Sequence, residues 1–326
     1  MKNWIVTTTI NPPTPAMEKL GLSSEWEKVV IGDKKTPTDW HHEQFTYLGT
    51  SAQEERGYET ARLLPWNLPA RAMIGFLYAM EHGATTISQI DDDNIPYGAW
   101  SIPAYTGEYP HIEEKGFVNI YKNFTNAFIW PRGYPLDKIV EQKAASEIKK
   151  PGSVGIWQHL ADQDTDVDAI YRLTRGETVT FAQRDPVVLA PGTVCPFNCQ
   201  STTFEQSTFP LLYLPAFVSP RESDIMRGLI AQPLMWHIGK TLGFTSPTVL
   251  QERNPHDYRK DFAAELRIYL HAEEIYNIAR SHSSANASVD ENLKNVYAAL
   301  VEANIVPKEE LPLLDAWLAD IARLTS

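Results

Sequence analysis

Short apolar runs alternate with helical spacing along the first part of the chain. The runs rich in β-branched and apolar side chains, which are typical of buried strands, are residues 4–10, 28–31 and 85–90. Residues 52–63 carry helical spacing, and residues 70–82 predict a helix with its apolar side chains on one face and Gly83 at its end. Strands that alternate with helices predict an α/β fold with a mostly parallel central sheet.

The rest of the chain changes character twice. Residues 95–152 are rich in Pro, Gly and aromatic side chains and predict loops, whereas apolar runs at 187–189 and 211–218 predict two more strands. Helical spacing then dominates three stretches, at residues 258–280, 289–303 and 308–324. Ser288 and Glu291 have the spacing of a capping box, which follows a polar linker at 281–288. We therefore expect an α/β domain over residues 1–280 and a C-terminal helical extension over residues 281–326.

Composition narrows the class of protein. Of the 326 residues, 43% are hydrophobic, which excludes a disordered chain. The formal charge of −12 argues against a partner that is nucleic acid or an anionic membrane surface. Cys195 and Cys199 complete neither a disulfide framework nor a zinc site, which favours reduced thiols. Because neither a secretory leader nor an apolar run long enough to span a membrane is visible, we expect a cytoplasmic protein.

The sharpest chemical feature is a run of three carboxylates, Asp91, Asp92 and Asp93, that follows the third predicted strand directly. Adjacent carboxylates repel one another, and a divalent cation is the usual compensation. Oxygen ligands suit Mn²⁺ or Mg²⁺, and ligands of open α/β sheets bind beyond the carboxyl ends of the strands. Strand alternation would point Asp91 and Asp93 one way and Asp92 the other. The alternative is an acidic loop that faces solvent.

Polar side chains also follow the two earlier strands and precede the helix at 70–82. They could together bind a nucleoside diphosphate, and Arg71 offers phosphate a forked guanidinium. Each of them alone is equally compatible with a structural role. These candidates are Thr8, Asn11, Asp33, Lys34, Asn67 and Arg71.

Several longer motifs resemble the STELLO-type glycosyltransferase domain, in order, over residues 3–275. The segments that carry the resemblance are 4–14, 30–37, 91–94, 130–136, 166–173, 197–202, 223–228 and 253–258. The resemblance implies a GT-A-like nucleotide-sugar-binding fold, in which an Asp-x-Asp motif binds Mn²⁺ or Mg²⁺ and the metal bridges the donor diphosphate. By this resemblance Asp91 and Asp93 are metal ligands, Asp92 lies with the donor, and His256 is a further candidate ligand.

The same resemblance implies a catalytic base near the start of a helix that follows the acceptor loop. Asp224 is the first candidate and Glu222 the second, with Arg227 as a further catalytic candidate in the same motif. Asp224 could equally cap the helix, and His256 could be a hydrogen-bonded loop histidine.

Two further segments suggest contacts with a sugar. The alternating carboxylates at 162–168 do not make an EF-hand, since Val167 replaces the required glycine. Asp166 and Asp168 could instead bond sugar hydroxyls, or form a solvated acidic loop. Arg132 lies in a short segment that resembles the reversibly glycosylated polypeptides, which are nucleotide-sugar mutases, and could also form a structural salt bridge.

Three functions remain open from the sequence. The first is a metal-dependent glycosyltransferase that moves a sugar from a nucleoside diphosphate, with UDP expected, to a glycan, lipid-linked or other acceptor. The second is a nucleotide-sugar mutase, which needs no acceptor, and the third is a non-catalytic GT-A scaffold. The apolar faces of the C-terminal helices would either dock on the core or form a homo-oligomer.

Overall fold

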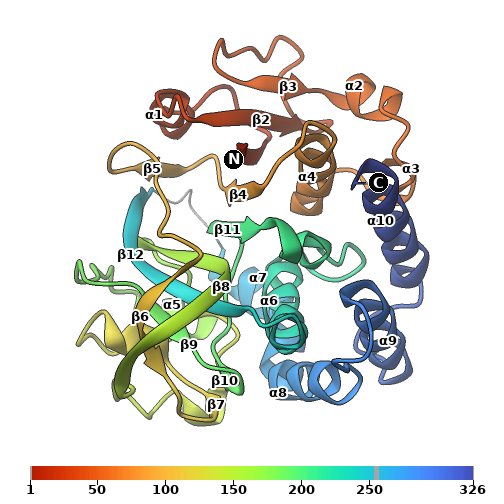
Figure 1. The fold of residues 1–326 in the computed structure, drawn as a ribbon. Coiled ribbons are helices and arrows are strands. Elements are labelled where there is room, and N and C mark those ends of the chain that lie inside the picture. The colour runs from red at the N-terminus through yellow and green to blue at the C-terminus, as the bar shows by residue number, and fades with distance from the viewer. Residues whose placement is uncertain (1, 253–256, 326) are drawn as a thin grey trace.

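The computed structural model describes residues 2–252 and 257–325, and it shows a mixed α/β fold (Figure 1). Its first part is built from parallel strands in the spatial order β3, β2, β1, β4. Gly75 on α4 lets the helix approach this sheet, because a Cβ there would lie 2.5 Å from Val6 Cγ1. The elements of this part are β1 (Asn3–Thr9), α1 (Pro15–Gly21), β2 (Trp26–Gly32), β3 (Thr46–Leu48), α2 (Thr50–Glu55), α3 (Glu59–Leu63), α4 (Ala72–Glu81) and β4 (Thr86–Ile90).

The sheet continues beyond β4 with changes of direction. β11 (Ser201–Glu205) runs antiparallel to both of its neighbours, β4 and β8 (Glu147–Gln163), and β12 (Thr241–Gln251) runs parallel to β8. The N-terminal half of β8 pairs instead with β6 (Thr106–Ile112), in antiparallel register. The remaining strands are β5 (Asn94–Pro96), β7 (Gly116–Phe117), β9 (Val187–Leu189) and β10 (Thr193–Val194).

A mostly parallel sheet is therefore not confirmed. In the large sheet of the described chain, parallel and antiparallel pairings are equally frequent. The parallel part is the one formed by strands that alternate with helices. The segment between β6 and β8 contains two 3₁₀ helices and no α-helix, and these two strands pair antiparallel.

Three helices of the second half pack around the helix Pro220–His237, and the last helix of the described chain returns to α3 and α4 (Figure 1). Their apolar side chains belong to the same continuous hydrophobic cluster as those of β1 and α4. No helix in the described ranges has both the length and the apolar content to cross a membrane. These helices are α5 (Ala169–Thr174), α6 (Pro220–His237), α7 (Tyr258–Ala264), α8 (Leu266–Ser281), α9 (Val289–Glu302) and α10 (Glu310–Thr325).

Several element predictions are confirmed and others are wrong. The capping box of Ser288 and Glu291 forms, and Gly83 ends α4 with φ +78°. The stretch 52–63 is two helices, because Gly57 adopts φ +68° between them. The predicted strand at 211–218 is wrong: a 3₁₀ helix covers Gln206–Leu212 and no strand follows it directly. Pro210 and Pro215 lack the amide hydrogens that a strand ladder needs.

Candidate active site

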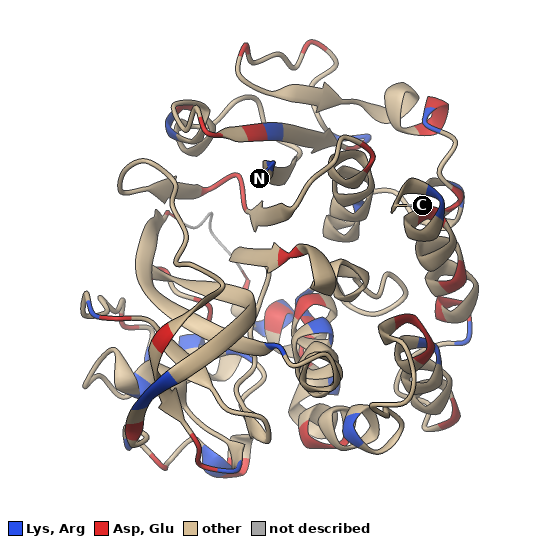
Figure 2. Ribbon diagram, in the orientation of Figure 1, with Lys and Arg blue, Asp and Glu red and all other residues tan. Residues whose placement is uncertain are grey.

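The parallel strands change the direction of their connections between β1 and β4. The chain leaves β1 toward β2, whereas β4 lies on the other side of β1. Ligands of open α/β sheets bind at such a point, beyond the carboxyl ends of the strands. The three carboxylates 91–93 occupy this place, and they form the red segment between β4 and β5 in Figure 2.

The side chains of these three carboxylates diverge. Asp92 turns toward the end of β1, where its Oδ2 accepts hydrogen bonds from Thr9 Oγ1 and, over 3.1 Å, from Asn11 Nδ2. Asp93 accepts from Gln251 Nε2 at 3.3 and 3.4 Å. Asp91 lines a separate cavity together with Gln251 and Asp224. The run therefore connects the end of β1, the end of β12 and the N-terminus of α6.

Asp91 lies in a surplus of negative charge. Burial, and then the carboxylates of Asp93, Asp92, Asp224 and Asp166, raise the pKa of Asp91 well above its usual value. A divalent cation would reverse this effect, so the donor set fits Mn²⁺ or Mg²⁺. In the described ranges, however, no three or more His, Cys, Asp or Glu side chains are grouped closely enough to hold a metal ion by themselves.

A metal at this point would therefore need further ligands. Mg²⁺ is commonly bound by one or two carboxylates together with substrate phosphates, and Asp91 and Asp93 offer two carboxylates beside the cavities described below. The predicted ligand His256 lies outside the described residues. Glu252, the last described residue before it, lines a third cavity with Asp92 and Asp93.

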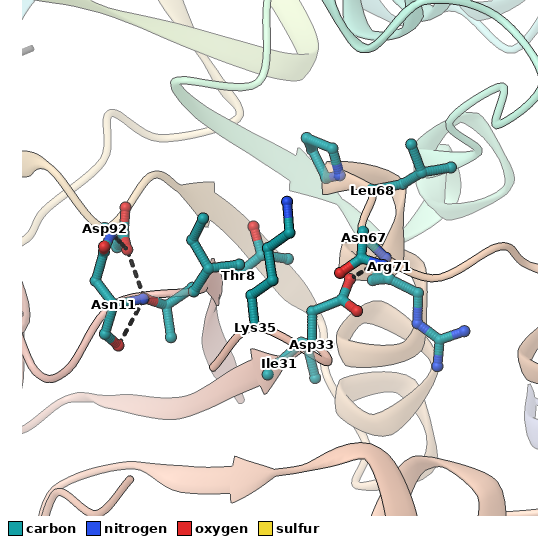
Figure 3. A pocket seen from close by; sticks show the side chains of 13 residues that line it. Thr8, Asn11, Ile31, Asp33, Lys35, Asn67, Leu68, Arg71 and Asp92 are labelled. Atoms are coloured by element: carbon teal, nitrogen blue, oxygen red, sulfur yellow. Dashed lines mark hydrogen bonds between the residues drawn. The ribbon is translucent and has the colours of Figure 1, made fainter. Parts of the chain in front are cut away.

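A cavity of about 410 Å³ lies beyond the ends of β1 and β2 (Figure 3). The structure brings most of the predicted donor-binding residues together in its wall, and these come from positions between 8 and 92 of the sequence. Lys35 lines it where Lys34 was predicted, and the Lys34 ammonium lies 5.5 Å from the centre of the Trp66 ring. The predicted residues in the wall are Thr8, Asn11, Asp33, Asn67, Arg71 and Asp92.

Two charged side chains of this wall are already engaged. Asp33 accepts hydrogen bonds from the backbone N–H groups of Asn67 and Lys34, both at 2.7 Å. Arg71 donates from Nε to Gln53 Oε1 at 3.1 Å and from Nη1 to the Leu64 carbonyl at 3.0 Å. The role of Arg71 toward phosphate stays a prediction, and in this structure its donors hold the wall itself.

Asn67 carries a feature that the sequence did not single out. Its φ is +61°, an uncommon backbone conformation for a residue other than glycine. Its backbone N–H is held by Asp33, and its neighbour Leu68 also lines the large cavity. Such strained residues gather where ligands bind, which supports a binding role for this turn.

A second cavity of about 200 Å³ adjoins the first, because Pro69 lines both. Arg132 lines this second cavity and pairs with two of its carboxylates. The guanidinium donates from Nη1 and Nη2 to both oxygens of Asp224, at 2.9 and 2.8 Å, and from Nε to Asp166 Oδ1 at 2.9 Å. Asp166 also accepts from Asn198 Nδ2 at 2.9 Å. The sequence analysis treated Arg132 and Asp166 separately, whereas the structure joins them in one ion-pair network.

The three catalytic candidates lie in different surroundings. Asp224 lines the second cavity, and although burial alone raises its pKa, the guanidinium of Arg132 lowers it below the usual value. Glu222 completes the capping box of Ser219 at the start of α6 and accepts from the Arg267 backbone N–H at 2.9 Å. Arg227 is buried and donates to Gln89 Oε1 at 2.8 Å. Of the three, only Asp224 lines a described cavity.

The side chain of Asp168 lies in different surroundings from that of Asp166. It is fully buried, caps α5 through the Tyr171 backbone N–H and accepts from Trp130 Nε1 at 2.6 Å. Its position indicates a structural contact rather than an open sugar site. Trp130, which donates this hydrogen bond, is buried as well.

Several wall residues of the second cavity were not predicted. Cys199 and Gln200 lie in one of the motifs that carry the family resemblance, so that motif was the available signal. Gln251 ends β12, and only the fold brings it to Asp93. Both cysteines are free thiols, and burial raises the pKa of Cys199 well above its usual value.

Comparisons with known proteins agree with this picture. A family profile described as STELLO glycosyltransferases matches residues 221–326. Probable glycosyltransferase STELLO1 of Arabidopsis thaliana is 28% identical over 343 residues, which cover 98% of this chain and 44% of that protein. Probable glycosyltransferase STELLO2 of the same plant is 27% identical over 346 residues, with the same coverage of both chains. The chain thus spans less than half the length of these curated relatives. The profile and both relatives confirm the resemblance carried by the motifs: this chain is similar to proteins of the STELLO-type family.

Proposed function

We propose that this chain is a metal-dependent glycosyltransferase with a GT-A-like fold, which moves a sugar from a UDP-linked donor to a hydroxyl acceptor. The observation that carries the proposal is the pair of adjoining cavities that flank the carboxylates 91–93 at the change in strand direction. The family description and the names of the relatives both support glycosyl transfer.

The two cavities would bind different parts of the donor. The larger one, beyond β1 and β2, has the size and polar wall for the nucleoside, with Asn67 and Asp33 at its edge. The smaller one, lined by Asp91, Asp166 and Asp224, would take the sugar. Asp91 lines the smaller cavity, and Asp93 lines the third cavity next to Asp92, which also lines the larger one. Asp91 and Asp93 would hold the metal, which when bound neutralises charge on the leaving diphosphate.

The acceptor hydroxyl needs a base as the new bond forms. The bond from the sugar to the diphosphate breaks, a bond from the sugar to the acceptor oxygen forms, and the acceptor loses a proton. Asp224 lines the sugar cavity, and the two hydrogen bonds from Arg132 keep its carboxylate ionised and fixed in orientation. We assign the proton to Asp224 for this reason.

Calorimetric titration of UDP, with Mn²⁺ and with a chelator, tests the proposal. We expect binding only with Mn²⁺, and we expect Asp93→Asn to weaken that binding at least tenfold without changing the unfolding midpoint. Asp185→Asn, which removes an exposed carboxylate, is the matched control and should bind as the parent does. Binding of UDP that is equal with metal and with chelator would overturn the metal assignment.

An assay of turnover separates transfer from the alternatives. A transferase releases UDP from its donor at a rate that rises with an acceptor alcohol, whereas a mutase leaves the diphosphate attached. A scaffold would do neither. Acceptor-independent rearrangement of the donor sugar would replace the transferase proposal.

A further inference from the structure

The wall of the smaller cavity contains more carboxylates than guanidinium groups. Asp91, Asp166 and Asp224 contribute three carboxylates to its wall. Among the described residues that line it, the cations are Arg132 and Arg221. What this cavity can accept therefore depends on whether either guanidinium is free to meet a ligand.

Arg132 is not free. All three of its side-chain nitrogens donate hydrogen bonds, to Asp166, to both oxygens of Asp224 and to the Arg221 carbonyl. Its side chain is only 5% exposed, so it cannot turn toward a ligand without breaking these bonds. Because one guanidinium balances two carboxylates, the Asp166–Arg132–Asp224 group keeps one net negative charge.

Arg221 is engaged as well. Its Nε donates to Glu265 Oε1 at 2.8 Å, and its Nη2 donates to the same oxygen. Glu265 is fully buried and also accepts from the Ala169 backbone N–H at 2.8 Å. Releasing Arg221 would leave a buried carboxylate without its guanidinium, which is costly.

The charged groups that the wall offers to a ligand are therefore carboxylates, above all Asp91 and Asp166, since both oxygens of Asp224 also accept from the backbone N–H groups of Ile225 and Cys199. Carboxylates accept hydrogen bonds and donate none when they are ionised. Sugar hydroxyls donate to such groups. A divalent ion held by Asp91 and Asp93 would be shared with the donor diphosphate, and it would leave the net charge of the Asp166–Arg132–Asp224 group in place.

We propose that the transferred sugar is uncharged, a neutral hydroxyl-bearing hexosyl or pentosyl unit, and that the Asp166–Arg132–Asp224 group excludes uronic acids and other acidic sugars. The inference rests on the proposed function and adds the chemical class of the donor. Placing a sugar carboxylate beside this group would bring like charges together where little water screens them. A hydroxymethyl group at the same position would instead donate a hydrogen bond.

UDP-glucose and UDP-glucuronate make a matched test, because they differ only in a hydroxymethyl group and a carboxylate. Each is titrated into the full chain with Mn²⁺. We expect UDP-glucuronate to bind at least tenfold more weakly. Equal or tighter binding of UDP-glucuronate would overturn the inference while leaving the glycosyltransferase intact. If the chain binds GDP and not UDP, GDP-mannose and GDP-mannuronate replace the pair; failure of both nucleotides would reject the proposed function and this inference together.

Variants connect the discrimination to its source. Asp166→Asn leaves Arg132 balanced by Asp224 alone, so we expect the preference for the neutral sugar to fall at least threefold. Asp164→Asn is the control, because Asp164 pairs with Arg172 and does not line the cavity. A preference that is unchanged in Asp166→Asn, or reduced equally in both variants, would show that the Asp166 charge is not its source.

Discussion

At the scale of single residues, buried polar side chains join strands that are distant in the sequence. His159 on β8 is 1% exposed, and its ring nitrogens lie 2.9 Å from Thr245 Oγ1 on β12 and 3.0 Å from Thr203 Oγ1 on β11. Burial lowers the pKa of His159 to about 3, so the ring is neutral in the folded protein. The side chain of this histidine therefore joins β8, β11 and β12.

The buried histidine predicts acid sensitivity. An unfolded histidine takes up a proton below a pH of about 6.5, whereas folded His159 stays neutral down to a pH of about 3. Its contribution to stability is therefore complete above that unfolded value and is lost as the pH falls. We expect this residue alone to lower the free energy of unfolding by about 2 kcal/mol between pH 8 and pH 5, measured by urea unfolding at both values.

His159→Gln isolates the effect, since an amide can still bond both threonines. The variant should lose about 2 kcal/mol less than the parent over the same pH interval. His41→Gln, which replaces an exposed histidine, should retain the parental pH dependence. An unchanged slope in His159→Gln would show that another group causes the acid sensitivity.

At the scale of elements, α6 determines where the second cavity lies. Its N-terminus carries Arg221 and Asp224, and its middle packs against the segment that carries Cys199. Gly228 makes this packing possible, because a Cβ there would lie 2.5 Å from the Phe197 carbonyl oxygen. The helix and the segment before β11 can approach closely only at a residue without a side chain.

Gly228→Ala tests this close approach. Alanine favours a helix over glycine by about 1 kcal/mol, but a backbone oxygen cannot move aside cheaply. We expect a net loss of about 1–3 kcal/mol in the free energy of unfolding, measured by urea denaturation. Gly98→Ala is the control, since no atom lies within 4 Å of the added Cβ. A stabilised Gly228→Ala variant would mean that the segment at Phe197 yields.

At the scale of the whole molecule, the last two helices close the core rather than stand apart from it. Trp317 on α10 is fully buried and donates from Nε1 to the Pro210 carbonyl at 3.0 Å. The carboxylate of Asp320 accepts from Thr60 N at 2.8 Å and Glu59 N at 3.2 Å, at the start of α3. The division at residue 280 stays a prediction, and an unfolding experiment tests it.

Trp317→Ala tests whether the last two helices unfold together with the rest of the chain. Truncating a buried tryptophan costs about 3–5 kcal/mol, and we expect the loss to lower one transition seen alike by far-UV circular dichroism and by fluorescence. Lys308→Ala, at an exposed position before α10, should leave the midpoint unchanged. Two separate transitions, with only the smaller one moved by Trp317→Ala, would support an independent C-terminal extension.

The alternation of strands and helices in the first part of the chain could be predicted because those segments follow simple periodicities. Periodicity did not predict β8, β12 or α6, since each contains residues that normally interrupt such elements, and only the family resemblance implied that a helix starts near Asp224. Pro151 and Gly155 lie within β8, Pro247 lies within β12 and Pro233 lies within α6. Tertiary packing overrides these local signals, as it does at Gly243, where an added Cβ would lie 2.2 Å from the Trp157 ring.

The candidate site was predicted to a similar extent. The residues after β1, β2 and β4 could be grouped, because parallel strands end at one edge of a sheet. The joining of Arg132 to both Asp166 and Asp224 had no signal in sequence spacing, since 34 residues separate the first pair and 92 the second. The hydrogen bonds of Arg71 and Asp168 within the protein could not be predicted either. The sequence names an arginine or an aspartate but does not show whether its side chain contacts a ligand or another part of the chain.

By itself, the sequence determined the class of fold in its parallel part, the position of the acidic run at a strand end, and the relationship to the STELLO-type family. These depend on local periodicity and on motifs of neighbouring residues. Only the tertiary structure decided which charges are free, because a side chain's partners come from segments far away along the chain. The engagement of Arg132 and Arg221 is of this kind, and it leaves the smaller cavity with its negative charge.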